Sequence, residues 1–209
     1  MIKFFRHIRQ RLLGQNQFSK YLFYALGEIV LVVIGILLAL QINNWNEKQK
    51  IDATKQKTMG LIAKELAANQ AIIESAFAYH VMVKDTLQTL ETPTTEEEAV
   101  KSLSFWRGLR IVRMRNAAFQ TAVQAGSTKD FDVDLAEALN ALYTLQDAYN
   151  DFGAAASSSL YQHDFSELRN FRQIATFLNM VMVDAYYFET ELQKGFADCL
   201  EKLENHSSP

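Results

Sequence analysis

The stretch YLFYALGEIVLVVIGILLALQI, residues 21–42, decides the architecture that we expect for this chain. At 1.5 Å per residue, a helix of this length spans roughly 33 Å, enough to cross a hydrocarbon core about 30 Å thick. Its only strongly polar residues are Glu28 and Gln41, and Gln41 alone interrupts residues 29–42. A buried helix of a soluble core rarely has so long an apolar run, so the sequence predicts a transmembrane helix.

Aromatic residues flank this stretch as they do at membrane interfaces: Tyr21 and Tyr24 at one end, Trp45 just beyond the other. The alternative is a cleaved signal peptide. The run is too long for a typical signal-peptide core, and LALQINNWNE offers no good small-x-small cleavage site. We therefore expect an uncleaved signal anchor, with Tyr21, Tyr24 and Trp45 as interface anchors.

The basic residues of the two flanks indicate an orientation. Lys3, Arg6, Arg9, Arg11 and Lys20 precede the apolar run without any acid, and Lys48, Lys50, Lys55 and Lys57 follow it together with Glu47 and Asp52. A short tail of positive charges is a poor candidate for translocation, so we expect a cytoplasmic N-terminus and a C-terminal domain on the other side.

Residues 1–20 form a basic N-terminal segment with two possible forms. Its apolar residues share one stripe at helical pitch, which favours an amphipathic helix lying on anionic lipid: Met1, Phe4, Phe5, Ile8 and Leu12. The other interpretation is a disordered basic tail that only sets the topology.

The remaining composition favours helices. Hydrophobic residues make up 49% of the 209 residues, and there are only 8 Gly and 2 Pro. A net charge of −3 gives no reason to expect nucleic-acid binding. The single cysteine, Cys199, excludes an internal disulfide and a cysteine-cluster zinc site.

Three apolar seams at helical spacing follow the anchor. The first runs over residues 52–91 and ends before Pro93: Met59, Ile62, Leu66, Asn69, Ile73, Ala76, His80, Val83, Leu87 and Leu90. The second begins after a possible cap at Asp132: Leu135, Ala138, Leu142, Leu145, Tyr149 and Phe152. The third follows a possible cap at Asp164 and includes one acid: Leu168, Phe171, Ala175, Leu178, Met182, Ala185, Glu189, Leu192, Phe196, Cys199 and Leu203.

The parts between the seams are less regular. Thr95 and Glu98 have the spacing of a capping box, and residues 96–125 predict one helix broken near Gly108 or two short ones, ending at Gly126. Residues 153–159 are a loop or a weak helical extension. We expect an all-α fold, with an antiparallel helical bundle over residues 43–204 and a disordered tail over 205–209.

Charge is segregated within the bundle. Residues 99–129 contain six bases and no acid, whereas residues 130–151 contain six acids and no base. One interpretation is two neighbouring helices that attract each other. The other is an anion-binding site built on Arg107, Arg110, Arg113 and Arg115.

Glu28 is the most informative residue of the apolar run, because a carboxylate within a membrane is costly unless it is protonated, paired or turned into protein. At 100° per residue, Glu28, Gly35 and Ala39 share one face, and Gly35 and Ala39 have the small-xxx-small spacing of close helix packing. The face predicts self-association or a membrane-protein partner. The alternatives are that Glu28 reaches the interface on its own, or that it couples to protons or ions.

No motif points to catalysis. The four histidines, His7, His80, His163 and His206, have no second ligand at metal spacing, and the sequence lacks the common nucleotide-binding, hydrolase and metalloprotease motifs. Asn69 and His80 are polar residues in a seam, where such residues usually set helix register. We expect no cofactor, no metal and no catalytic residues.

The opening block MIKFFRHIRQRLLGQNQFSKYLFYALGEIVLVVIGILLALQINNWNE resembles the start of a family of small uncharacterised single-span membrane proteins from Gram-negative bacteria. The GEI and QINNWNE residues carry the resemblance best, because hydrophobicity alone does not demand them. NAAFQTAVQAGS is a looser similarity. The resemblance implies a protein of the bacterial inner membrane and supplies no activity.

Three functions are therefore open. The first is a non-enzymatic anchored protein that self-associates or supports a membrane complex, with lipid and a protein as partners. The second is a receptor-like module that binds a small anion or envelope component near residues 107–115. The third is a membrane-associated enzyme or ion-coupling subunit, which would need a polar pocket of mutually close acids and bases.

Overall fold

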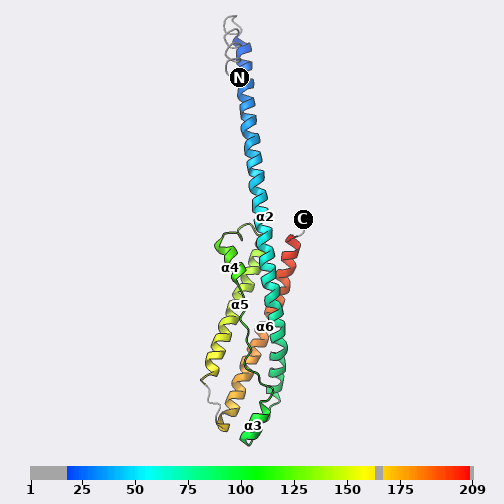
Figure 1. Ribbon diagram of the computed structural model, residues 1–209, viewed down its shortest axis with the longest axis vertical. Coiled ribbons are helices and arrows are strands. Elements are labelled where there is room, and N and C mark those ends of the chain that lie inside the picture. Colours follow the sequence, from blue (N-terminus) through cyan, green and yellow to red (C-terminus); the bar gives the residue numbers. More distant parts are fainter. Residues whose placement is uncertain (1–17, 163–166, 208–209) are drawn as a thin grey trace. The chain divides into compact units, whose positions relative to one another are not determined.

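The computed structural model describes residues 18–162 and 167–207, and these residues confirm the all-α fold (Figure 1). They form α2 (Phe18–Gln88), α3 (Glu96–Ser102), α4 (Ala117–Gln124), α5 (Val133–Leu160), the 3₁₀ helix η1 (Leu168–Asn170) and α6 (Phe171–Ser207), without a strand. The predicted amphipathic helix of residues 1–20 lies almost entirely outside the described residues, as does the predicted cap at Asp164. The chain divides into two units, before and after residue 53, which are treated separately below.

In the first unit, α2 contains one apolar stretch that could cross a membrane by length and composition. None of the side chains of its most apolar window is buried. The side chains at positions 26–54 are all exposed, including large ones such as Leu31, Leu37 and Ile42. Since apolar surface of this extent is unfavourable in water, this segment requires lipid or protein around it.

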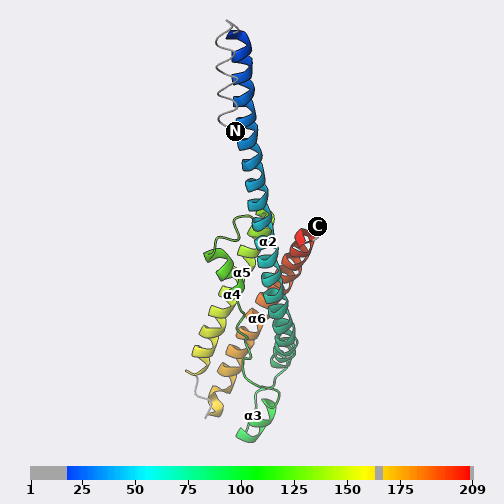
Figure 2. The same ribbon diagram turned by 45° about the horizontal axis from the view of Figure 1, so that its top comes forward.

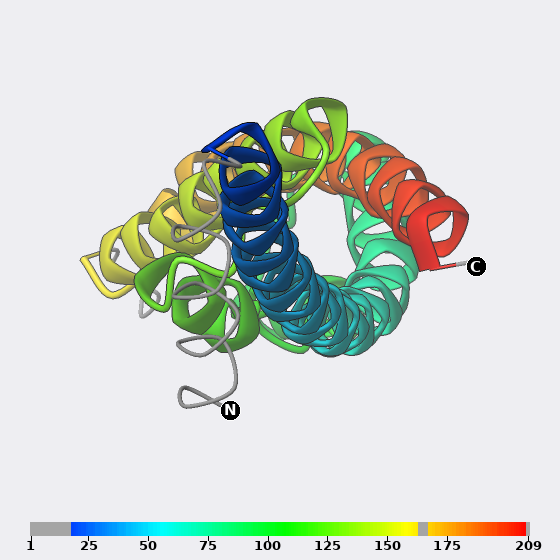
Figure 3. The same ribbon diagram turned by 90° about the horizontal axis from the view of Figure 1, so that it is seen from above.

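In the second unit, α5, α6 and residues 54–88 of α2 surround a common interior, seen end-on in Figure 3. The first seam is confirmed: every member from Met59 to Leu87 is buried, and Leu90 is partly buried against the core. The third seam is confirmed from Phe171 to Leu203, apart from a partly buried Ala175. Alternation of three and four residues therefore identified the interior faces of these two helices.

The second seam was only partly right. Leu135, Leu142 and Tyr149 are buried, and five residues outside the predicted seam are buried as well: Leu139, Tyr143, Gln146, Gly153 and Ala156. The buried surface of α5 is wide because this helix packs against α6 and also against the non-helical residues 103–116. Contacts on both sides explain why a single stripe underestimates its burial.

One part of the bundle, residues 103–116, is not the helix that an antiparallel bundle predicts. In Figures 1 and 2, residues 54–88 of α2 and the whole of α5 run in the same direction, and α6 runs in the opposite one. Residues 103–116, which join α3 to α4, return along the bundle without helical structure. The expected antiparallel bundle therefore has an extended segment where a fourth helix would complete the alternation. We call residues 103–116 the connecting segment.

Helix ends follow the predicted signals. Thr95 caps α3, because its Oγ1 accepts a hydrogen bond from the Glu98 amide at 3.2 Å. The Glu98 carboxylate accepts hydrogen bonds from the amide and hydroxyl of Thr94, which lower the pKa of Glu98. Asp132 caps α5 through the Asp134 amide. Gly126 ends α4 with a φ of 67°, a left-handed conformation that favours glycine.

Three expectations about the less regular parts are settled. Residues 96–125 form two short helices, α3 and α4, separated by the connecting segment. Residues 153–159 are helical, as part of α5. Residues 205–207 belong to α6, so the expectation of a disordered tail from residue 205 is wrong there. Leu203 is buried, and the His206 carbonyl accepts a hydrogen bond from Gln56 Nε2 of α2, which holds this end of the helix.

Candidate functional site

The predicted membrane-helix face lies on the apolar part of α2. Glu28, Gly35 and Ala39 are all exposed in the single chain, and a Cβ added at Gly35 would meet nothing within 4 Å. On a regular helix these residues project from one side. The face therefore has room for a close neighbour, and the described part of the chain contributes none.

The predicted interface anchors lie on the same helix. Tyr21 is half-buried, Tyr24 is 37% exposed and Trp45 is 60% exposed. The three residues bracket the apolar stretch along α2, as aromatic belts do.

The four candidate anion-binding arginines all lie on the connecting segment. Arg107, Arg110, Arg113 and Arg115 are exposed, whereas Leu109 and Met114 between them are buried. No carboxylate of the described residues forms an ion pair with any of the four. The interpretation as two neighbouring helices of opposite charge is wrong for these arginines, because the segment that carries them is not helical.

Arg110 has an unusual backbone conformation. Its φ is 51°, next to Gly108 with a φ of 90°. The guanidinium carbon lies 5.2 Å from the ring centroid of Tyr79, a cation–π geometry that offsets part of the backbone strain. This turn is the break that the sequence placed near Gly108.

Side chains of α2 replace the helical hydrogen bonds that the connecting segment lacks. The Tyr79 hydroxyl accepts from the Arg107 amide at 2.9 Å and donates to the Gly108 carbonyl at 2.8 Å. His80 Nε2 lies 2.8 Å from the Leu109 carbonyl oxygen, to which it donates. Buried backbone groups need such partners, so these side chains make the non-helical path possible.

Asn69 does the same at the other end of the connecting segment. Its Oδ1 accepts from the Arg115 amide at 3.0 Å, and its Nδ2 donates to the Arg115 carbonyl at 2.7 Å and to Gln146 Oε1 at 2.9 Å. Asn150 of α5 accepts from the Met114 amide at 3.0 Å. A carboxamide offers a donor and an acceptor side by side, as a neighbouring strand would.

Glu65 of α2 serves the start of α4. Its carboxylate accepts from the Ala118 amide at 2.8 Å and the Phe119 amide at 3.4 Å, which is favourable at a helix N-terminus. It also accepts from the Tyr143 hydroxyl at 2.8 Å. Burial, together with the Glu65 carboxylate, raises the pKa of Tyr143. The ring of Tyr143 stacks on Phe119, with centroids 4.2 Å apart.

The centre of the bundle holds a polar triad of His80, Tyr149 and Glu189. His80 Nδ1 lies 2.7 Å and the Tyr149 hydroxyl 2.6 Å from Glu189 Oε1, and all three residues have no exposed surface. Burial, and secondarily the Glu189 carboxylate, raises the pKa of Tyr149. Glu189 Oε2 has no hydrogen-bond partner among the described residues.

The hydrogen-bond partners of His80 restrict where the protons of His80 and Glu189 can lie. Both ring nitrogens of His80 face oxygen atoms, and the Leu109 carbonyl can only accept. Either His80 is doubly protonated beside an ionised Glu189, or a neutral His80 accepts from a protonated Glu189. In both arrangements one proton lies between His80 Nδ1 and the Glu189 carboxylate and the pair has no net charge, which is how an interior tolerates ionisable groups.

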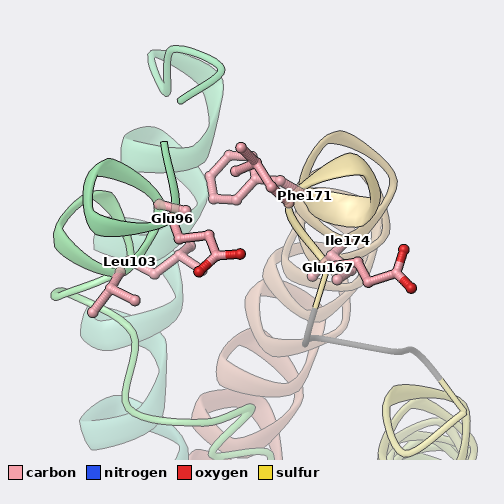
Figure 4. Close-up of a pocket in the computed structure, with 8 residues that line it drawn as sticks. Glu96, Leu103, Glu167, Phe171 and Ile174 are labelled. Carbon is pink, nitrogen blue, oxygen red and sulfur yellow. The ribbon is translucent and has the colours of Figure 1, made fainter. Parts of the chain in front are cut away.

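The triad has the residue types of catalysis, and its three side chains have no exposed surface among the described residues. It lines neither the hollow beside Arg113 nor the hollow between α3 and α6, and no group of described His, Cys, Asp and Glu residues could hold a metal ion. The hollow shown in Figure 4 lies between α3 and the start of α6, has a volume of about 210 Å³, and is mainly apolar. Phe171 and Ile174 line it, Glu96 is at its edge, and Glu167 points away from it.

Only part of this polar interior was predictable from the sequence. Asn69, His80 and Glu189 are visible as polar members of apolar seams. Glu65, Tyr79, Tyr143 and Gln146 were not predicted, and Tyr149 was predicted only as a core residue. Spacing could have found two of these residues, because Glu65 lies four residues before Asn69 and Gln146 lies four residues after Leu142.

Comparison with known proteins adds one match. Residues 28–89 match a family described as "Family of unknown function (DUF6090)". The match begins at Glu28, includes most of the apolar stretch and the first seam from Met59 to Leu87, and ends just after α2. The looser similarity over NAAFQTAVQAGS lies outside it. Searches of the curated proteins and of the solved structures find no match.

Proposed function

We propose that this protein is a membrane-anchored, non-enzymatic interaction protein that self-associates through its membrane helix. The observation that carries the proposal is the exposure of the apolar stretch of α2, whose most apolar window contains no buried side chain. Such a surface needs lipid around most of it, and one face of it has the composition of a helix–helix contact. The bundle would be the part that the anchor holds at the membrane.

The proposed location is a bacterial inner membrane, with the N-terminus in the cytoplasm and the bundle in the periplasm. A retained anchor predicts that the protein stays in the pellet after alkaline carbonate extraction and keeps its N-terminal residues. Protease added to spheroplasts should then digest the bundle. Release of a shortened chain into the soluble fraction would show a cleaved signal peptide instead.

The packing face is inferred from the free-energy cost of placing Glu28 in the hydrocarbon region. A carboxylate within the hydrocarbon region costs several kcal/mol unless it is protonated or finds a polar partner. Close approach of a second helix at Gly35 and Ala39 would bring Glu28 near its counterpart, where a protonated carboxyl can donate a hydrogen bond across the contact. A homo-oligomer therefore accounts for the acidic and the small residues together.

Cross-linking in native membranes tests the face. Gly35→Leu and Glu28→Leu should both reduce the cross-linked oligomer, Gly35→Leu because it adds bulk at the closest approach and Glu28→Leu because it removes the hydrogen bond. Gly27→Leu is the matched control, since Gly27 also meets nothing within 4 Å but lies about 100° away around the helix. Unchanged cross-linking in both face variants would rule the face out.

A second candidate function is a receptor-like module that binds an anion on the connecting segment. Its support is the exposure of four arginines that have no carboxylate partner among residues 18–162 and 167–207. Anion-dependent thermal stabilisation that Arg110→Ala/Arg113→Ala removes would favour this function over simple scaffolding.

A further inference from the structure

We propose that the connecting segment binds a linear polyanion along Arg107, Arg110, Arg113 and Arg115, with phosphate or carboxylate groups as the recognised chemistry. This inference rests on the second candidate function, and it specifies an extended ligand where that function requires only an anion.

The backbone beneath the arginines is fixed before any ligand arrives. Tyr79, His80 and Asn69 of α2 and Asn150 of α5 hold the backbone of residues 107–115 through six hydrogen bonds of 2.7–3.0 Å. Leu109 and Met114 are buried beneath the segment. A binding surface on this backbone loses little conformational entropy when a ligand binds, which favours affinity.

The positive charge of the connecting segment is not neutralised by carboxylates of the described residues. All four side chains are exposed, and none forms an ion pair with a described carboxylate. All four are arginine, whose guanidinium can bind phosphate or carboxylate through two parallel hydrogen bonds. Arg110 has one contact that stabilises the bundle, the cation–π contact with Tyr79. Stability of the bundle gives no reason for arginine at positions 107, 113 and 115.

The arginines are spread along the length of the connecting segment. An extended chain advances at most about 3.5 Å per residue, so residues 107–115 cover up to about 28 Å, and the turn at Gly108 and Arg110 shortens that span. Figure 1 shows the segment running along the bundle from the end of α3 toward α4. A linear polymer of regularly spaced anions can follow such a segment and contact several arginines at once, whereas one small anion contacts only neighbouring arginines.

Nearby acids divide this row into two halves. Asp151 lines the same surface hollow as Arg113, and Asp147 accepts a hydrogen bond from Asn116, the residue after Arg115. These carboxylates weaken the potential near Arg113 and Arg115. Arg107 and Arg110 lie outside that hollow, so the Arg107 half should contribute more to binding.

Binding of long-chain polyphosphate and of polygalacturonate to the full chain in zwitterionic nanodiscs tests the proposal, with tripolyphosphate as the short ligand. We expect either polymer to bind much more tightly than tripolyphosphate. Arg107→Gln/Arg113→Gln should lower the salt dependence of polymer binding, with the slope of log K against log salt falling by about 1.4, or about 0.7 per lost contact. Arg107→Lys/Arg113→Lys should restore the slope but only part of the affinity.

The control variant Lys64→Gln/Arg172→Gln removes two exposed basic side chains outside the connecting segment. This control should leave the slope of log K against log salt nearly unchanged. If it lowers the slope as much as Arg107→Gln/Arg113→Gln does, polymer binding is nonspecific charge attraction and the proposal is overturned. Equal binding of tripolyphosphate and the polymers would keep the second candidate function but overturn the linear ligand. Absence of binding to all three probes would overturn both the second candidate function and the linear ligand. Tighter binding to phosphatidylglycerol vesicles, with the same arginine dependence, would assign the row to a lipid surface and overturn the polymer.

Discussion

The buried triad shows how single residues determine the path of the chain. His80 joins α6, through Glu189, to the connecting segment, through the Leu109 carbonyl. Desolvating two ionisable groups is unfavourable, and their mutual hydrogen bonds offset that cost only while both partners are present. The triad is therefore expected to specify one arrangement of α2, α5 and α6.

His80→Ala should destabilise the bundle strongly. It leaves the Leu109 carbonyl unpaired and removes the partner that shares a proton with Glu189, and loss of one member of a buried pair costs about 3–5 kcal/mol. Urea unfolding of the full chain in detergent, followed by circular dichroism, measures the change. The double variant His80→Leu/Glu189→Leu should recover part of it. A cost for His80→Ala below about 1 kcal/mol would mean that the pair contributes little.

Cys199 gives a pH-dependent readout of the same interior. Burial raises the pKa of its thiol to about 11, from 9.0 in an exposed cysteine. The folded chain holds this proton more tightly than the unfolded chain, so folding suppresses the reactive thiolate at neutral and mildly alkaline pH. The free energy of unfolding therefore falls as pH rises from about 9 toward 11. Iodoacetamide should label Cys199 at pH 8 only after unfolding in urea. Rapid labelling of the folded chain at pH 8 would contradict its burial.

Among the elements, the connecting segment departs most from what the sequence predicted. Its apolar residues, Leu109, Ile111, Val112 and Met114, suit a helix or a strand equally well, and Gly108 only marks a break. The hydrogen-bond partners of its backbone are side chains of α2 and α5, at sequence separations of 28 to 46 residues. Local patterns carry no information about partners so distant, which is why the helices could be predicted and this segment could not.

A pair of glycine substitutions tests the close contact between the connecting segment and α5. A Cβ at Gly153 would lie 2.5 Å from Ile111 Cγ2, so Gly153→Ala should destabilise the bundle by about 1–3 kcal/mol despite the better helix propensity of alanine. Gly60 is exposed in α2 with nothing within 4 Å, so Gly60→Ala should stabilise it by about 0.5–1 kcal/mol. Thermal or urea unfolding measures both. Stabilisation by both substitutions would show that the segment lies farther from α5.

At the scale of the whole molecule, the sequence was informative where its pattern is local. The apolar run, the faces of two long helices and the caps at Thr95 and Asp132 followed from spacing and residue type. The candidate site was only partly predictable. The arginine positions and three polar seam residues could be read directly, but their partners depend on tertiary contacts. The face with Glu28, Gly35 and Ala39 depends on a contact between chains and stays a prediction.

The mass of the full-length protein, extracted in mild detergent and measured by light scattering with the detergent subtracted, tests the central claim most directly. Self-association through the membrane helix predicts a defined multiple of the chain mass that falls to a single chain for Gly35→Leu and persists for Gly27→Leu. A single chain for the unsubstituted protein, without a bound partner, would contradict the claim.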